Sequence, residues 1–250
     1  MLCDTSPRLR PGARNRRKAV SAHLGPSFEL GLTLSFPRTN VYVDGFNFYY
    51  AAFRGKRPRA ARLKWLNMAE FTRLVLPRHD VRLVRYFTAT VKPVEWDPHQ
   101  HLRQGAYLRA LSSLPEVSVH TGSFTRWKVR RPLVDPPSEG PRTALVWDTK
   151  EKGSDVNLAT DLLLDAFEDR YETAIVISDD SDLLEPVRMV RERLGKRVGV
   201  VRVRTDRGSV FRGKVDLLVE ARAWHFERAQ LPDDVPLPTG GTVSRPTSWR

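Results

Sequence analysis

Cysteine is nearly absent, because Cys3 is the only one in 250 residues. A single cysteine excludes an internal disulfide and any zinc site built from several thiolates. It is typical of a reducing compartment, so we expect a cytoplasmic protein. Long apolar runs are also absent, since none reaches the ~18 residues that a membrane-spanning helix needs. The early arginines precede no apolar stretch, so residues 1–37 do not resemble a signal peptide and no membrane association is expected.

Acidic residues are scarce relative to basic ones. The chain has 42 Lys and Arg against 29 Asp and Glu, which gives a formal net charge of +13 and a pI near 10.3. Such an excess favours a polyanionic partner, with nucleic acid ahead of an anionic membrane. A merely basic, solvated surface is the alternative, since net charge informs about partners and not about fold.

Regular hydrophobic spacing is missing at both ends of the chain. Residues 1–38 are rich in Arg, Pro, Ser and Gly without a clear period, which predicts a disordered basic tail. Residues 229–250 contain several prolines and a Gly-Gly pair, which predicts a second disordered tail. One domain is therefore expected over residues 39–228.

Between these ends, short apolar runs alternate with segments of helical spacing. We expect strands at residues 41–43, 81–90, 117–124, 174–177 and 198–203. We expect helices at residues 65–76, 97–114, 154–167 and 181–194. This alternation predicts an α/β fold with a parallel or mostly parallel sheet covered on both faces. Residues 126–146, with four prolines and a glycine, are expected to form a long loop or an irregular hairpin.

Three separated segments place acidic or amide side chains at a strand end or a helix start. They are Val-Asp-Gly-Phe-Asn at 43–47, Lys-Gly-Ser-Asp at 152–155 with Asp161 downstream, and Ser-Asp-Asp-Ser-Asp at 178–182. In open α/β sheets, ligands bind beyond the carboxyl ends of the strands. If the strands at 41–43 and 174–177 are neighbours, the carboxylates that follow them converge.

Converging carboxylates repel one another and resist ionisation, and a divalent cation relieves this repulsion. Oxygen ligands without cysteine or a histidine pair favour Mg²⁺ or Mn²⁺ over zinc. Such an ion can polarise a phosphoryl oxygen, activate a water molecule and stabilise the leaving oxygen. The acidic segments therefore indicate a magnesium or manganese site.

Each segment also has an ordinary structural explanation. Asp44 before a glycine is a common turn, and carboxylates at residues 179–182 can simply complement a helix dipole. Ser154 or Asp155 can be a helix N-cap, and the stripe that carries Asp161 can be a solvated helix face. The coincidence of three such segments favours a functional site over these separate explanations.

The three segments, in this order and spacing, resemble the NYN family of the PIN-like nuclease superfold. The similarity spans roughly residues 39–205. It implies a PIN-like three-layer α/β fold with a mostly parallel central sheet, a Mg²⁺ or Mn²⁺ site, and hydrolysis of RNA phosphodiester bonds. The basic residues 1–38 and the proline-rich residues 132–141 lie outside the family pattern.

The resemblance also implies roles for single residues. Asp161 matches the second acid of the helix motif, and Asn47 matches an asparagine that supports the site. Lys152 matches a lysine that can contact phosphate, whereas Asp179 falls at a variable position. The acids that match metal-holding positions, directly or through water, are Asp44, Asp155, Asp180 and Asp182.

Two runs of basic residues without intervening acids favour a polymeric RNA substrate. The first is expected to contact phosphates through Arg54, Arg57, Arg59 and Arg62. The second is expected to do so through Arg126, Lys128 and Arg130. Trp127, within the second run, can stack on an unpaired base. Each run can instead be an ordinary solvated loop, and Trp127 can belong to the core.

Our interpretation is a metal-dependent ribonuclease that acts on single-stranded RNA. One alternative is a non-catalytic RNA-binding module of the same fold, against which the intact acid set argues. Another is a metal-dependent phosphatase acting on small phosphate esters. The Asp-x-Asp pair that such an enzyme has after its first strand is missing from this chain, since Gly45 and Phe46 follow Asp44. The oligomeric state is left open.

Overall fold

The structure is a computed structural model, and it describes residues 35–53, 58–203 and 208–250. The tail predicted over residues 1–34 therefore lies outside the described residues. Phe36–Arg250 form one unit. The first strand begins at Arg38, whose backbone N–H donates a hydrogen bond to the Glu172 carboxylate at 2.8 Å. The domain thus starts one residue before the boundary expected from the sequence.

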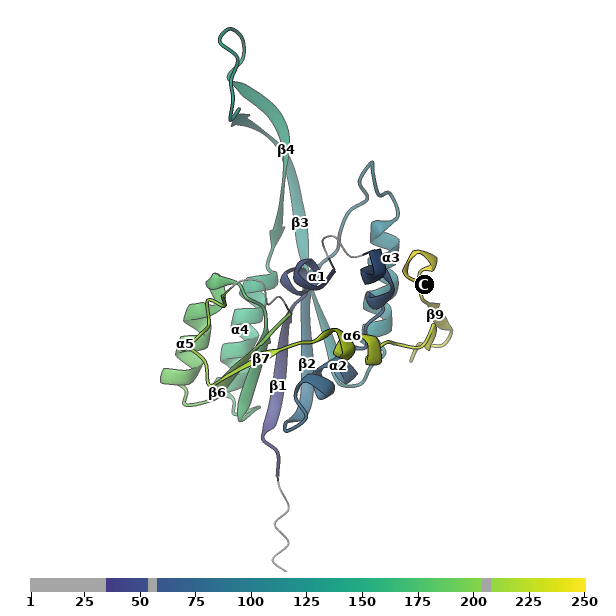
Figure 1. Cartoon of the computed structure of the whole chain (residues 1–250), viewed down its shortest axis with the longest axis vertical. Helices are drawn as coiled ribbons and strands as arrows, with labels where there is room; N and C mark the ends of the chain where they lie inside the picture. Colours follow the sequence, from purple (N-terminus) through teal and green to yellow (C-terminus); the bar gives the residue numbers. More distant parts are fainter. Residues whose placement is uncertain (1–34, 54–57, 204–207) are drawn as a thin grey trace, which may run out of the picture. The chain divides into compact units, whose positions relative to one another are not determined.

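Seven strands in the described part of the chain form one sheet, in the order β4-β3-β2-β1-β5-β6-β7 (Figure 1). The pairing is parallel everywhere except between β3 and β4. The mostly parallel sheet expected from the sequence is confirmed. The strands are β1 (Arg38–Asp44), β2 (Asp80–Ala89), β3 (Val117–Pro132), β4 (Thr143–Lys152), β5 (Thr173–Ile177), β6 (Arg197–Arg202) and β7 (Leu217–Glu220).

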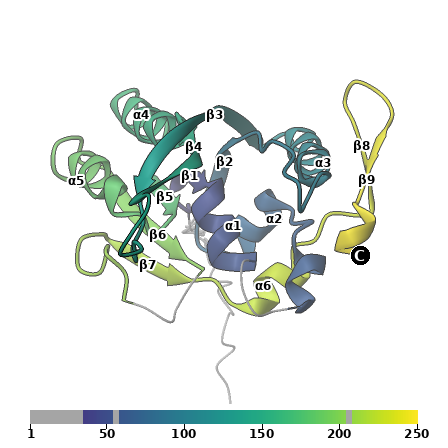
Figure 2. The same ribbon diagram turned by 90° about the horizontal axis from the view of Figure 1, so that it is seen from above.

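Helices cover both faces of this sheet (Figure 2). On one face lie α4 (Ser154–Phe167) and α5 (Leu184–Glu192). On the other lie α1 (Gly45–Phe53), α2 (Met68–Val75), α3 (Gln100–Ser112) and α6 (Ala223–Arg228). Single 3-10 turns at Pro58–Leu63 and Ser181–Leu183 precede α2 and α5. None of these described helices combines the length and the apolar composition that a bilayer crossing requires.

The central strand β1 shows why the sheet needs cover on both sides. Val41 and Val43 face the layer of α1, α2, α3 and α6, where they join a core that includes Phe71. Tyr42 faces the opposite way and packs in the core formed with Leu158 of α4. Because successive side chains enter different cores, both must be largely apolar. This is the reason that central strands of the sequence are short continuous apolar runs.

Beyond the sheet, β3 and β4 continue as a two-stranded arm (Figure 1). Their antiparallel pairing runs from Ser123 opposite Lys152 to Pro132 opposite Thr143. The expectation of a long loop or an irregular hairpin over residues 126–146 is therefore wrong for most of this segment. Its four prolines lie at or beyond the last paired residue of β3, where they interrupt no internal ladder hydrogen bond.

The C-terminal segment is also regular, which corrects the prediction of a disordered tail over residues 229–250. Val235 in β8 (Asp234–Pro236) and Val243 in β9 (Thr242–Ser244) are both buried in the core. Trp249, in the 3-10 turn Thr247–Trp249, packs on Trp65 with ring centroids 6.3 Å apart. The apolar residues of this segment are too widely spaced to give a period, so composition alone suggested disorder.

We expect Trp249→Ala to lower the free energy of unfolding by about 3 kcal/mol, because removing a large buried ring leaves a cavity. Trp249 is 8% exposed, whereas Trp96 is 86% exposed. Trp96→Ala is therefore the matched control, with an effect within about 0.5 kcal/mol. Urea denaturation of both variants measures the difference. Equal midpoints would show that the C-terminal segment does not pack on the domain.

Candidate active site

Asp44 ends β1 and is 4% exposed. It stands at the N-cap position of α1, where its Oδ1 accepts a hydrogen bond from the Asn47 N–H at 3.0 Å. Its Oδ2 accepts a second hydrogen bond from the Ser178 hydroxyl at 2.9 Å. Burial raises the pKa of Asp44, and these hydrogen bonds oppose the rise. The carboxylate is thus fixed between the segments that follow β1 and β5.

The turn after β5 brings two more carboxylates to the same edge of the sheet. Because β1 and β5 are parallel neighbours, Asp44 and Ser178 lie side by side. The Asp180 N–H donates to the Ser178 hydroxyl at 3.1 Å, and the Asp182 N–H donates to the Asp180 carboxylate at 3.0 Å. Asp180 is therefore the N-cap of a 3-10 turn, as one alternative suggested, and its proximity contributes to the raised pKa of Asp44.

Asp155 reaches this edge from the first turn of α4. Gly153 precedes the helix with φ 101°, a left-handed conformation that glycine adopts without strain. The N–H and the hydroxyl of Ser154 both donate to Glu151 Oε1, at 3.0 and 2.8 Å. Glu151 therefore satisfies the start of α4. Sequence analysis did not select it, although an acid just before a helix start was the available signal.

We call Asp44, Asp155, Asp180 and Asp182 the carboxylate cluster. Burial, together with the negative charges of Asp44, Asp180, Glu151 and Asp182, raises the pKa of Asp155 to about 6. These electrostatic effects come from three separate segments of the chain. The acidic segments identified in the sequence therefore converge, as expected for neighbouring strands.

The chemistry of the cluster fits a hard divalent cation, because its donors are all carboxylate oxygens. The described residues nevertheless contain no group of three or more His, Cys, Asp or Glu side chains arranged to hold a metal ion. The cluster is thus coupled by charge without forming a chelate. Shared coordination requires the exposed Asp182 and the half-buried Asp155 and Asp180 to turn toward the fixed Asp44.

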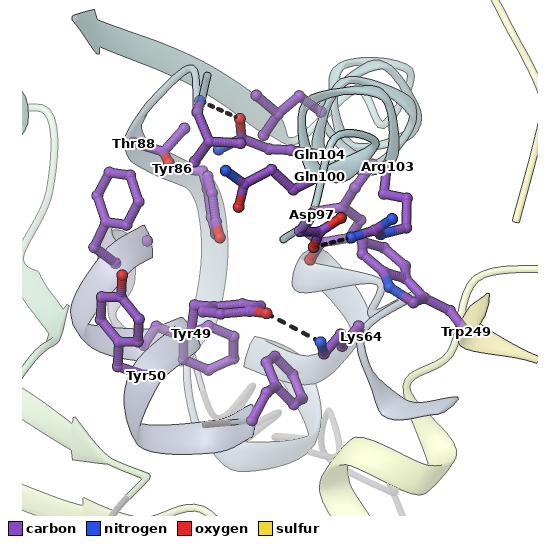
Figure 3. Close-up of a pocket in the computed structure, with 17 residues that line it drawn as sticks. Tyr49, Tyr50, Lys64, Tyr86, Thr88, Asp97, Gln100, Arg103, Gln104 and Trp249 are labelled. Atoms are coloured by element: carbon purple, nitrogen blue, oxygen red, sulfur yellow. Dashed lines mark hydrogen bonds and ion pairs between the residues drawn. The ribbon is translucent and has the colours of Figure 1, made fainter. Parts of the chain in front are cut away.

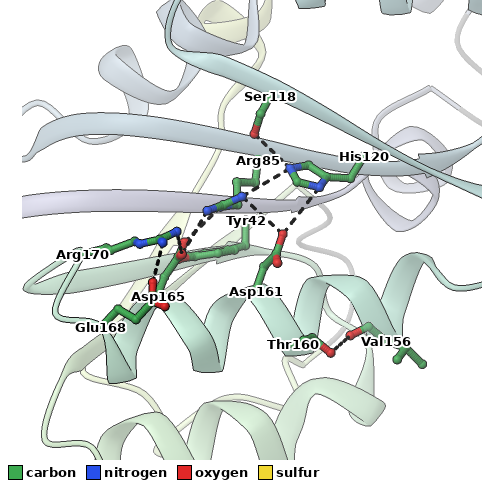
Figure 4. A network of polar contacts seen from close by, with 10 residues as sticks. All are labelled: Tyr42, Arg85, Ser118, His120, Val156, Thr160, Asp161, Asp165, Glu168 and Arg170. Atoms are coloured by element: carbon green, nitrogen blue, oxygen red, sulfur yellow. Dashed lines mark hydrogen bonds and ion pairs between the residues drawn. The ribbon is translucent and has the colours of Figure 1, made fainter.

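Asp161 is not brought to this cluster. Six residues along a helix shift a side chain by about 9 Å and about 240° around the axis from Asp155. Its Oδ2 instead faces Arg85 at 3.3 Å and His120 at 3.5 Å (Figure 4). Arg85 also pairs with the buried Asp165 at 2.9 Å, so Asp161 belongs to a polar network between α4 and the sheet.

Asn47 links α1 to the turn after β5. Its Oδ1 accepts a hydrogen bond from the Asp179 N–H at 3.2 Å, while its own N–H holds Asp44. Asn47 therefore contacts both acidic segments, and its supporting role in the site stays a prediction. The Asp179 side chain accepts a hydrogen bond from Ser209 at 2.6 Å and pairs with Arg202 at 3.5 Å. Asp179 is therefore engaged on the side away from Asp155.

The first basic run is only partly described. Arg54 and Arg57 lie outside the described residues, and Arg59 lies in the turn Pro58–Leu63. Arg62 is exposed, and its backbone carbonyl accepts a hydrogen bond from Arg245. Lys152 is exposed at the base of the arm, opposite Ser123. Contact between these residues and phosphate stays a prediction.

The arm has one face that is both basic and aromatic, which we call the basic face. Directly opposed residues of an antiparallel pair share a face, and alternate residues along a strand do not. Arg126, Lys128 and Arg130 therefore lie on the same face as Trp147 and Leu145. The Arg126 guanidinium lies 4.3 Å from the centroid of the Trp147 ring, and the Lys128 ammonium lies 5.2 Å from it.

The basic face leads directly to the carboxylate cluster. The next pair on this face, toward the sheet, is Phe124 opposite Glu151. The Phe124 ring contacts the ring of Phe46, two residues after Asp44, with centroids 5.5 Å apart. The charge of Glu151 contributes to the raised pKa of Asp155. The cationic strip and the acidic edge are therefore continuous.

The other face of the arm has a mixed composition. Arg131 is paired with Asp148 at 2.8 Å, and Lys150 lies 5.8 Å from the centroid of the Trp127 ring. Trp127 is 38% exposed, so the alternative that it belongs to the core is wrong. Trp127 points to the other face of the arm from Arg126, Lys128 and Arg130, because successive residues of β3 alternate between the two faces.

The mostly parallel sheet of this chain lies between two layers of helices, and acids follow its central strands. This is the arrangement of a PIN-like, nuclease-like fold. The chain belongs to the NYN domain family, a family of PIN-like nuclease domains, because the NYN domain matches residues 38–219. The matched residues include every acid of the carboxylate cluster and the whole arm.

Two individual proteins are similar to this chain. The 6-hydroxy-3-succinoylpyridine 3-monooxygenase HspA of Pseudomonas putida is 30% identical over 188 residues, which are 66% of this chain and 59% of the relative. This chain thus spans less than two thirds of that relative. A solved structure of a protein of unknown function from Vibrio parahaemolyticus has 15% identity and a TM-score of 0.45, covering 75% of this chain and 94% of the other.

We expect Asp155→Asn to raise the melting temperature in metal-free buffer at pH 7.5 by a few degrees. The folded pKa of Asp155 is about 6, above its ordinary value, so wild-type stability falls as pH rises through that range. The neutral amide avoids this loss, which we put at about 1 kcal/mol because Asp155 is partly screened by solvent. Mn²⁺ should raise the melting temperature of the wild type more than that of the variant.

Thermal denaturation between pH 4 and pH 8, with EDTA or with Mn²⁺, measures both effects. The advantage of Asp155→Asn should vanish near pH 4, where Asp155 is protonated in the folded protein. Glu95→Gln, which removes an exposed carboxylate outside the cluster, is the control. An advantage that is the same at every pH would contradict carboxylate repulsion as its cause.

Proposed function

We propose that this chain is a metal-dependent ribonuclease that hydrolyses phosphodiester bonds of single-stranded RNA. The observation that carries the proposal is the convergence of four aspartates at the carboxyl ends of β1 and β5 and at the start of α4. Mg²⁺ or Mn²⁺ would offset their repulsion, held by Asp44, Asp155, Asp180 and Asp182. Such an ion, when bound, supplies a Lewis acid and an activated water.

The residues of the site divide into fixed and adaptable groups. Asp44 is held through both oxygens, so it provides an anchor that does not need to reorganise. Asn47 and Ser178 maintain that anchor through their hydrogen bonds. Asp155 and Asp180 are half-buried and can adjust around a charge that enters the site. A fixed anchor with adjustable neighbours suits a site that admits and releases a polymer.

The basic face of the arm supports RNA rather than a small ester as the substrate. Three cations on one strand face can neutralise successive phosphates, and Trp147 offers a ring to an unpaired base. The strip ends at Phe124 and Glu151, next to the cluster. RNA held along this face would therefore pass the carboxylates. Lys152, Arg59 and Arg62, with Arg54 and Arg57, would add further phosphate contacts.

Asp44→Asn should abolish RNA cleavage while the protein keeps its fold and its affinity for RNA. Loss of metal charge stabilisation removes several kcal/mol, so we expect a rate at least about 100-fold lower. The measurement is cleavage of a labelled single-stranded RNA with Mn²⁺ or with EDTA, with Glu95→Gln as the control. RNA that binds but is never cut by the wild type would favour a non-catalytic module.

Replacing Arg126, Lys128 and Arg130 together by Ala should weaken RNA binding and its salt dependence. Each lost phosphate contact changes the slope of log affinity against log salt by roughly 0.7 on a single strand, so the slope should flatten by about 2. The background is Asp44→Asn, which binds without cutting. The matched control is Arg131→Ala with Lys150→Ala, which removes cations from the other face of the arm.

The basic-face variant removes three cations and the control removes two. A change in slope that is the same per removed cation in both sets would mean that the arm acts only through its total charge. A flat salt series, combined with turnover of a small phosphate ester by the wild type, would favour a phosphatase instead. The RNA salt titrations measure the slopes, and a chromogenic phosphate ester assay measures the turnover of a small ester.

The relative named a 6-hydroxy-3-succinoylpyridine 3-monooxygenase suggests a second candidate, hydroxylation of a pyridine ring. Insertion of one oxygen atom from O₂ requires two electrons from a reductant, for example a reduced nicotinamide dinucleotide. Incubation with that pyridine and reductant, followed by mass spectrometry of the product, separates this candidate from the nuclease. A gain of one oxygen atom without RNA cleavage would replace our proposal.

A further inference from the structure

A cavity of about 190 Å³ lies on the sheet face that carries α1 and α3 (Figure 3). Its walls are largely aromatic and include Tyr49, Tyr86, Tyr107 and Trp249. The Tyr86 and Tyr107 rings meet edge to face at 6.3 Å, and Tyr107 meets Trp249 at 6.1 Å. A cavity of this size holds one small ring system, since a dry engineered cavity of about 150 Å³ accepts benzene.

The hydroxyl of Tyr86 points into this cavity (Figure 3). Tyr86 is 6% exposed, and no residue of the described chain forms a hydrogen bond with its hydroxyl. The hydroxyl opens on the cavity instead of being enclosed by protein, so it is available to a ligand with a polar edge. Burial and the charge of Asp44 raise the pKa of Tyr86, which keeps the hydroxyl protonated as a donor.

The position of Tyr86 depends on the glycine that follows Asp44. A Cβ at Gly45 would lie 2.8 Å from the Tyr86 ring and 2.7 Å from the Phe87 carbonyl oxygen. The absence of a side chain at Gly45 therefore lets the ring pack against the start of α1. Gly45 also lines the cavity, and it directly follows Asp44 of the carboxylate cluster in the chain.

Polar and charged groups surround the aromatic walls. Gln100 extends its amide toward the cavity in Figure 3, and its nitrogen donates to the Lys92 carbonyl at 2.6 Å. Lys64 donates to the Tyr49 hydroxyl at 3.0 Å and lies 5.1 Å from the centroid of that ring. No ion pair among the described residues neutralises Lys64. The cavity thus combines flat walls, edge-directed polar groups and one free positive charge.

We propose that this cavity binds one unpaired nucleobase of the RNA, in the nucleotide next to the phosphate at the carboxylate cluster. The inference rests on the proposed function, because the carboxylate cluster would receive a phosphate and the cavity would then hold the base next to that phosphate. The aromatic walls stack on the base, and the Tyr86 hydroxyl and the Gln100 amide meet its polar edge. Lys64 faces the adjacent phosphate.

A fluorescent base tests the proposal without any cleavage. Short RNA oligomers carry a single 2-aminopurine at each position in turn and are mixed with the full chain in EDTA. Stacking quenches this base, so quenching should be strong at one position only. Tyr86→Phe should reduce the affinity for that oligomer about fivefold, the typical effect of one lost hydrogen bond. Tyr49→Ala should reduce it about tenfold through lost stacking.

Tyr171→Phe is the matched control, since it removes a buried hydroxyl that donates to the Leu162 carbonyl on the other side of the sheet. It should leave the quenching unchanged. The melting temperatures of all variants show whether they fold. Quenching that is equal at all positions, or that survives both cavity substitutions in folded protein, would overturn the proposal.

Adenosine and uridine monophosphates, titrated separately and followed by calorimetry, distinguish this proposal from the nuclease proposal. Nucleotide binding that Tyr86→Phe weakens, without RNA cleavage in Mn²⁺, would support the cavity and contradict the nuclease. Cleavage of RNA, with no effect of either cavity substitution on quenching or on the cleavage rate, would support the nuclease and contradict the cavity proposal. Binding of a pyridine carboxylate but of neither nucleotide would also overturn the assignment to a nucleobase.

Discussion

The rest of the site depends on one buried carboxylate. Asp44 lies almost entirely out of water, where an unpaired charge would be unfavourable, and its two oxygens are satisfied by the Asn47 N–H and the Ser178 hydroxyl. Those two partners belong to the segments after β1 and β5, so both segments must adopt fixed courses. The turn that carries Asp180 then follows from its own hydrogen bond to Ser178. One desolvated group thereby sets the geometry of the acidic edge.

Three surfaces meet at this edge, and each belongs to a different layer of the fold. The arm contacts this edge through Phe124, whose ring packs on that of Phe46. The aromatic cavity borders it at Gly45 and Tyr86, in the layer of α1 and α3. Helix α4, in the opposite layer, contributes Asp155. Charge of both signs and flat apolar walls are thus gathered around one point. The positive charge and the flat walls are complementary to the phosphate and the base of a nucleotide.

Local patterns predicted much of this arrangement. The helix expected over residues 154–167 has those bounds in the structure, although its N-cap is Gly153 and not Ser154 or Asp155. The convergence of Asp44 with Asp180 followed from the expectation that the strands before them are neighbours, which β1 and β5 are. The position of Asp161 did not, since a motif records spacing along the chain and not the rotation of a helix relative to its neighbours. Trp249 was missed because its contacts with Trp65 and Tyr107 join parts of the chain that are distant in sequence.

Among the residues that the structure describes, no second layer covers the central pair of the arm, Val129 opposite Val146, and Val146 is 39% exposed. Two strands alone are only marginally stable in water, so ladder hydrogen bonds rather than apolar burial hold it together. Such a segment can open locally at far lower free energy than the sheet core. Changes in the arm therefore leave the global unfolding equilibrium nearly untouched. Side-chain packing therefore restricts the sequence of the arm far less than it restricts the strands beneath it.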